Sequence, residues 1–158
     1  MKKSLFITQS AVFAALYVVM TVVSNAFGLA NGAVQLRISE ALTILPAFTP
    51  AAIPGVVIGC FISNLMTDGV LMNIIGGTFA TLLGAVGTRL VRNHKHLISL
   101  PPIAANTIIV PFIIKYAYGA PGTYWYFAFT VFLGEAICAG IMGTAFAAAL
   151  RKRPNLFN

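Results

Sequence analysis

The sequence predicts an all-α, polytopic membrane protein that forms a single transmembrane domain over residues 1–158. Apolar residues (AVILMFWYC) fill 59% of the 158 positions, charged residues fill only 8%, and the mean hydropathy is +0.91. Because a soluble domain carries about 25% charged residues, this composition excludes a water-soluble enzyme, a disordered chain and a disulfide scaffold. The apolar segments predict six transmembrane helices within the lipid bilayer, one or two of them short.

Four apolar segments are each long enough to cross the hydrocarbon core of a bilayer, which takes about 20 helical residues. They are approximately Leu5–Phe27, Val70–Val91, Leu97–Tyr118 and Trp125–Leu150. The first segment follows two lysines and has the charge pattern of a signal peptide, but the chain downstream is equally apolar. We therefore expect an uncleaved first span.

The segment Ile38–Met66 is interrupted by Pro46, Pro50 and Pro54, so it is either one broken span or two short ones. Charge decides between these alternatives because Lys and Arg gather on the cytoplasmic side of membrane proteins. If the segment crosses twice, turning near Phe48–Pro50, both termini are cytoplasmic and most basic residues share that side. The eight cytoplasmic ones are then Lys2, Lys3, Arg89, Arg92, Lys95, Arg151, Lys152 and Arg153, and the two outer ones are Arg37 and Lys115.

The second span, at about Ile38–Phe48, is too short to cross the bilayer core alone. An α-helix of about 10 residues reaches only about 15 Å. Its ends must therefore be covered by protein or lie against a polar cavity, since lipid cannot satisfy exposed backbone groups.

The acidic residues are few, and Glu135 lies within a span. A charged group there costs about 2.5–3.5 kcal/mol on insertion scales and is a functional candidate by default. Helical rise places Glu135 about 16 Å below the outer boundary, and Asn106 lies at nearly the same depth in the neighbouring span. The two side chains either hold a hydrogen-bonding ligand or bond each other across two helices.

Further candidates lie nearer the outer face. Arg37 and Glu40 are three residues apart, so at a helix start they share a face and either pair or contact a ligand. Tyr124 and Trp125 lie where an aromatic belt is expected, whereas an inward-turned ring would stack on a flat ligand. Lys115 lies near a span end, where its ammonium group either reaches the interface or contacts the ligand.

Catalytic and metal-binding motifs are absent from the sequence. It contains no G-x-x-x-x-G-K-[ST], H-E-x-x-H or G-x-S-x-G motif, so we expect neither an enzyme nor ATP binding by this chain. His94 and His96 lie in a basic loop without a nearby acid or cysteine, and we expect no metal site and no cofactor. The net charge of +7 comes from short basic runs between apolar segments, which indicates membrane anchoring rather than nucleic-acid binding.

The stretch from Gln35 to Asn64 is the most specific part of the sequence. The informative segments are Val34–Thr43, Pro46–Gly55, Gly59–Cys60, Ser63–Leu65, Gly76–Thr78 and Ala80–Leu82. Together they resemble the queuosine precursor transporter (QueT) family, whose members are substrate-binding (S) components of energy-coupling factor (ECF) transporters. The resemblance covers most of the chain.

The resemblance implies a six-helix S-component bundle in a bacterial cell membrane, which agrees with the charge-based count. It implies capture of a deazaguanine precursor of queuosine from outside the cell, with a transmembrane coupling protein and two cytoplasmic ATPases as partners. It also implies that an A-x-x-x-A motif on the first helix, here Ala11 and Ala15, docks on the coupling protein. Metal-specific S components carry His beside the initiator Met, where this chain has Lys2.

The polar candidate residues match the hydrogen-bonding groups of a deazaguanine. A carboxylate accepts adjacent N–H groups of a guanine-type edge, for which Glu135 and Glu40 are the candidates. An exocyclic ammonium group would meet Asp68, while amides would serve the ring acceptors and an aromatic residue would stack on the ring. The full set of candidate binding residues is Glu135, Glu40, Asn106, Asn64, Asp68, Arg37, Trp125, Tyr124 and Lys115.

Two other functions are compatible with the same residues. An S component for another flat solute, such as a flavin or thiamin, would use the same carboxylates, amides and aromatic rings. A membrane assembly protein would instead bind partner helices through its small-residue faces. It would need no soluble ligand and no functional role for Glu135.

Overall fold

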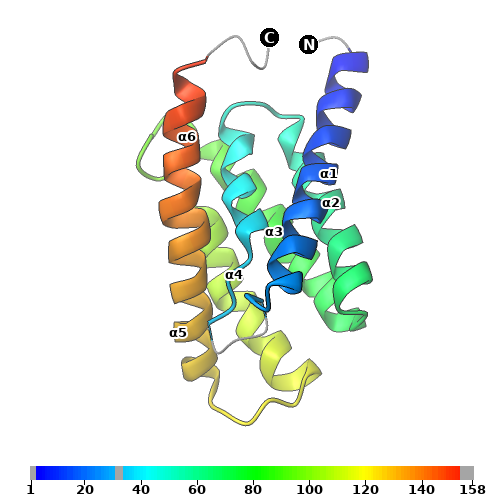
Figure 1. The fold of residues 1–158 in the computed structure, drawn as a ribbon. Helices are drawn as coiled ribbons and strands as arrows, with labels where there is room; N and C mark the ends of the chain where they lie inside the picture. The colour runs from blue at the N-terminus through cyan, green and yellow to red at the C-terminus, as the bar shows by residue number, and fades with distance from the viewer. Residues whose placement is uncertain (1–2, 31–33, 154–158) are drawn as a thin grey trace.

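The computed structural model describes residues 3–30 and 34–153, and every regular element in these ranges is a helix. The elements are α1 (Lys3–Ala26), η1 (Ile38–Ala47), α2 (Ala52–Thr67), α3 (Leu71–Leu90), α4 (Leu100–Phe112), η2 (Ile113–Ala117), α5 (Tyr124–Glu135), η3 (Ala136–Met142) and α6 (Gly143–Arg151). Because α4 continues into η2, and α5 continues through η3 into α6, the described ranges contain six helical rods. The predicted all-α bundle is confirmed (Figure 1).

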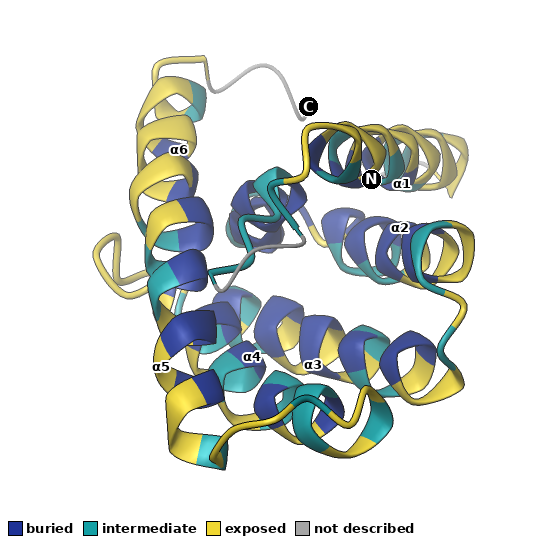
Figure 2. Cartoon of the chain, turned by 60° about the horizontal axis from the view of Figure 1, so that its bottom comes forward, coloured by how far each residue is buried: buried dark blue, intermediate teal, exposed yellow. Residues whose placement is uncertain are grey.

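Within the described ranges, three rods are long and apolar enough to cross a membrane: α1, α3 and Tyr124–Arg151. The shorter apolar helices are η1, α2 and the α4–η2 rod. The span predicted from Leu97 starts at Leu100 instead, with Pro101 and Pro102 in the first helical turn. Proline is favoured in this turn because the backbone N–H that it lacks would have no partner within the helix. The exposed residues lie on the outward faces of the helices (Figure 2), and many of them are large and apolar, as a polytopic membrane protein requires.

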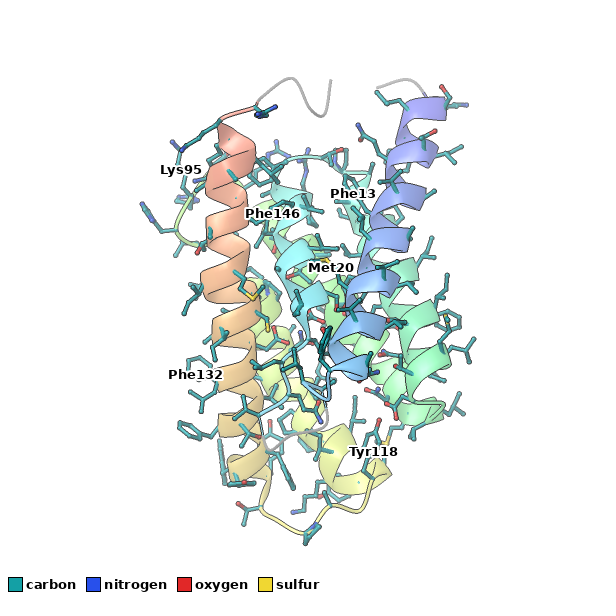
Figure 3. The ribbon with its side chains drawn as sticks, viewed as in Figure 1. Phe13, Met20, Lys95, Tyr118, Phe132 and Phe146 are labelled. Atoms are coloured by element: carbon teal, nitrogen blue, oxygen red, sulfur yellow. The ribbon has the colours of Figure 1, made fainter. Side chains whose placement is uncertain are left out.

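The segment Ile38–Met66 forms two helices, as the charge pattern predicted. The turn between them occupies residues 48–51. In consequence the start of α1, the connection between α3 and α4 and the end of α6 lie at one end of the bundle (Figure 1). Lys95 lies at this basic end, and Tyr118 lies at the opposite end, which we call the outer end (Figure 3).

The short helix η1 lies inside the bundle, with α1, α3 and α6 packed around it. Residues Ser39–Pro46 are all buried. The element is a 3-10 helix, which advances about 2.0 Å per residue and so reaches about 20 Å rather than the 15 Å expected of an α-helix. The surrounding helices shield η1 from lipid, which confirms the prediction that protein covers this short span.

Glycines allow close backbone contact at two places that determine the shape of the interior. A Cβ on Gly59 of α2 would lie 2.7 Å from the Cβ of Tyr17, so α1 and α2 touch along their backbones. A Cβ on Gly134 of α5 would clash with the carbonyl oxygen of Gln35. The segment that leads into η1 therefore lies directly against α5.

The substitution Gly134→Ala tests this contact. Because the new methyl group meets backbone rather than a flexible side chain, we expect a loss of about 1–3 kcal/mol in the free energy of unfolding. The matched control is Gly140→Ala on the same rod, where the nearest atom would be 3.6 Å away and no clash arises. Thermal unfolding in detergent measures both, and equal melting temperatures for the two variants would contradict the close approach.

Candidate functional site

A polar cavity lies inside the bundle between η1, α3, α4 and α5. We call it the inner cavity, and it is lined by Gln35, Arg37, Glu40, Gly77, Thr81, Asn106, Val110, Val131 and Glu135. Its volume is about 20 Å³, which has room for a water molecule but not for an aromatic ring. Four of the predicted binding residues, those at positions 37, 40, 106 and 135, meet here.

A hydrogen-bonded chain joins four helices at the level of this cavity. The Asn106 amide nitrogen on α4 donates to Glu135 Oε1 at 2.9 Å and to Glu40 Oε2 at 3.4 Å. The Tyr17 hydroxyl on α1 donates to Glu40 Oε1 at 2.5 Å. The predicted common depth of Asn106 and Glu135 is thus confirmed, and Glu40 is held by Tyr17 and Asn106.

Two polar groups of the inner cavity have no partner among the described residues. They are Glu135 Oε2, an acceptor, and Arg37 Nε, a donor, and both atoms are buried. A buried polar group without a partner costs about 1–3 kcal/mol, so such groups in a cavity wall are candidates for ligand contact. The inner cavity therefore presents one free acceptor and one free donor.

The backbone that carries Arg37 is held by α1. The Ile38 backbone N–H donates to Ser24 Oγ at 3.0 Å, and Thr21 Oγ1 donates to Ser39 Oγ at 2.8 Å. Arg37 itself is extended, with φ −95° and ψ 98°, before η1 begins. This geometry places Arg37 on the wall between the inner cavity and a second one.

The second cavity lies nearer the outer end and has a volume of about 110 Å³. We call it the outer cavity, and it is lined by Asn25, Ala30, Gln35, Arg37, Thr67, Asp68, Asn73, Val110, Ile113, Ile114 and Tyr118. It shares Gln35, Arg37 and Val110 with the inner cavity. The two cavities are therefore neighbours with a common wall.

Asp68 is the acidic group of the outer cavity. Its Oδ2 accepts hydrogen bonds from the Asn73 amide and the Tyr118 hydroxyl. Burial, together with the neighbouring Asp68 carboxylate, raises the pKa of the Tyr118 phenol above its ordinary value. The phenol therefore stays protonated and continues to donate.

The other predicted binding residues lie outside both cavities. Asn64 is fully buried on α2, where its amide nitrogen donates to the Asn73 carbonyl oxygen at 3.4 Å, behind Gly77 of the cavity wall. Trp125 is 79% exposed. The Tyr124 hydroxyl donates to the Ile108 carbonyl oxygen at 3.0 Å.

Lys115 also lies outside the two cavities. Its Nζ lies 5.6 Å from the centre of the Tyr116 ring. Lys115, Tyr124 and Trp125 therefore line neither cavity, and their location at the membrane interface stays a prediction.

Comparison with known proteins identifies the family. Residues 7–152 match a family model described as QueT transporter. The chain belongs to the QueT transporter family. The resemblance carried by the stretch from Gln35 to Asn64 is thereby confirmed.

A curated relative of this QueT family member is the Queuosine precursor transporter QueT of Lactococcus lactis subsp. cremoris, which is 34% identical over 93 residues. The matched stretch covers 59% of this chain and 55% of the relative, so it spans about half of the relative's length. No solved structure shows significant similarity to the chain.

Tyr17 is the site residue of this QueT family member that sequence reasoning missed. A signal for it exists, because Tyr17, Thr21 and Ser24 recur at helical spacing on α1 and form a polar stripe within an apolar span. All three side chains are buried and face η1. A polar stripe on one face of a transmembrane helix thus marks the side that supports a polar interior.

Removing the Tyr17 hydroxyl should destabilise the bundle. Because a hydrogen bond to a carboxylate contributes about 1.5–3 kcal/mol, we expect Tyr17→Phe to lower the free energy of unfolding by that amount. The matched control is Tyr126→Phe, whose ring is 52% exposed and whose loss of a hydroxyl should have little effect. Reversible unfolding in mixed detergent micelles measures both, and equal stabilities would show that the Tyr17–Glu40 contact contributes nothing.

Proposed function

We propose that this chain is the substrate-binding S component of an ECF-type importer, and that it captures a queuosine precursor, a deazaguanine base, from outside the cell. Family membership and the name of the Lactococcus relative support this class of solute. The observation that carries the proposal is the buried inner cavity, in which Glu135 Oε2 and Arg37 Nε have no partner among the described residues.

The chemistry of a guanine-type base complements these two groups. Such a ring presents N–H donors on one edge beside a carbonyl acceptor. Glu135 Oε2 would accept from a ring N–H, and Arg37 Nε would donate to the ring carbonyl. The ligand would thereby satisfy groups that are unpaired without it, and an analogue lacking either function would be rejected strongly.

Admission of the ring requires movement, because the inner cavity has a volume of only about 20 Å³. The element best placed to move is the segment 34–36, which lies outside the helices and carries Gln35 of the shared wall, while Arg37 stays at the start of η1. Displacing it would merge the inner and outer cavities into one space that opens toward the outer end.

The partners and membrane orientation complete the proposal. The chain has no phosphate loop, so ATP would be hydrolysed by two cytoplasmic ATPases that act through a transmembrane coupling protein. The basic end of the bundle, where α1 begins and α6 ends, would face the cytoplasm of a bacterial cell. The coupling protein would dock on an apolar groove of about 710 Å³ between α1 and α2, where Ala11 and Ala15 are exposed.

A binding titration of the purified chain in detergent tests the solute. The ligand panel comprises aminomethyl-deazaguanine, cyano-deazaguanine, guanine, riboflavin and thiamin. We expect a deazaguanine to bind most tightly, and Glu135→Gln to weaken it at least about tenfold because the carboxylate acceptor is lost. The control Thr49→Val removes another buried hydroxyl, just beyond the far end of η1, and should leave the affinity unchanged.

The outcomes of this titration are distinct. Tight binding of riboflavin or thiamin instead would reassign the S component to another flat solute. A folded protein that binds no member of the panel would overturn solute capture and favour a membrane assembly protein.

Docking is tested separately by the substitution Ala15→Trp. A large side chain on the small-residue stripe should prevent the close helix approach and abolish co-purification of the coupling protein and ATPases. The control Val12→Trp places the same side chain on α1 at an exposed position outside the groove. If both variants retain the partners, or both lose them, the groove is not the docking surface.

A further inference from the structure

The charge of the two cavities is opposite in sign to that of the chain. The chain carries a net charge of +7 and has three acidic residues. All three, Glu40, Asp68 and Glu135, line the two cavities, whereas Arg37 is the only basic residue among the described residues that line them. The two cavities together have a formal charge of −2, of which Glu40 and Glu135 in the inner cavity are the source, while Asp68 and Arg37 balance each other in the outer cavity. A negative formal charge across the shared wall favours a cationic ligand.

The outer cavity also lies where helices present their negative ends. α1, α2 and the α4–η2 rod end beside it, at Ala26, Thr67 and Ala117 respectively, whereas η1 and α3 begin beside it, at Ile38 and Leu71. A helix C-terminus carries a partial negative charge and stabilises a cation nearby, so the ends of three helices outweigh the starts of two. This contribution comes from the backbone and is independent of the acidic side chains.

The Asp68 carboxylate is fixed in place and has one free oxygen. Both of its hydrogen bonds, from Asn73 and Tyr118, fall on Oδ2, and no described residue donates to Oδ1. Asn73 is 4% exposed and so holds the carboxylate from the buried side. An oriented carboxylate with a free oxygen in a polar cavity is a suitable partner for an ammonium group.

We propose that the outer cavity is an ammonium subsite, and that the preferred ligand is a deazaguanine whose ring carries a protonated amine. This inference rests on the proposed function and specifies its substrate. The ring edge lies in the inner cavity against Glu135 and Arg37, and the side group extends across the shared wall to Asp68 Oδ1. Arg37 is the one cation that faces the amine, and the surrounding acidic groups and helix ends outweigh it.

Two ligands that share the ring and differ in charge provide the test. Aminomethyl-deazaguanine carries an ammonium group, and cyano-deazaguanine carries a neutral group at the same position. We expect the purified chain to prefer the amine by about tenfold or more, as for one charge-assisted contact. The isosteric substitution Asp68→Asn should remove most of that preference and change the affinity for the cyano compound by less than about threefold.

Two further variants test which of the two cavities binds the ammonium group. Asp68→Glu retains the charge and should retain a preference for the amine. Glu135→Gln should weaken both ligands by a similar factor, because both present the same ring edge. If the preference instead survives Asp68→Asn and is lost in Glu135→Gln, the ammonium group lies in the inner cavity and the assignment to Asp68 is wrong.

The wild-type comparison needs no variant, so the inference does not depend on whether Asp68→Asn folds. Equal affinity for the two ligands, or a preference for the cyano compound, would overturn the ammonium subsite and leave deazaguanine capture standing. Failure of the wild-type chain to bind either ligand would overturn the proposed function itself.

Discussion

The arrangement of the bundle depends on two carboxylates, Glu40 and Glu135, that are buried at one level of a membrane protein. Lipid offers no hydrogen bonds, so these groups must find donors within the chain. Asn106 donates to both of them and Tyr17 donates to Glu40, which brings α1, η1, α4 and α5 together at one point. One carboxylate oxygen and one arginine nitrogen are left over. The network therefore both holds the helices and defines the candidate site.

The short helix η1 makes this interior possible. Because it starts partway through the bundle, the segment before it runs extended and places Gln35 and Arg37 where a longer helix would have filled the space. Gly134 admits that segment against α5, and Gly77 leaves a bare wall on α3. The shortened span and the bare wall at Gly77 thus leave room for the inner cavity.

Helix α1 contributes to two surfaces with different chemistry. Its inward stripe, represented by Tyr17 and Thr21, supports η1 through hydrogen bonds. Its small residues Ala11 and Ala15 border the apolar groove toward α2. One helix therefore contacts the polar interior with one face and borders the apolar groove with another.

The sequence by itself determined the membrane class through hydropathy, and the number of helices and the turn between the two short ones through proline positions and charge. It also determined the common depth of Asn106 and Glu135 through helical rise. All of these are local properties of the chain. Only the tertiary structure decided which polar groups meet. Tyr17 reaches Glu40, and Asp68 reaches Tyr118, across separations in the chain that no periodicity encodes. It also decided that Trp125 faces outward and that η1 is a 3-10 helix, since the rotation and winding of a helix depend on the neighbours against which it packs.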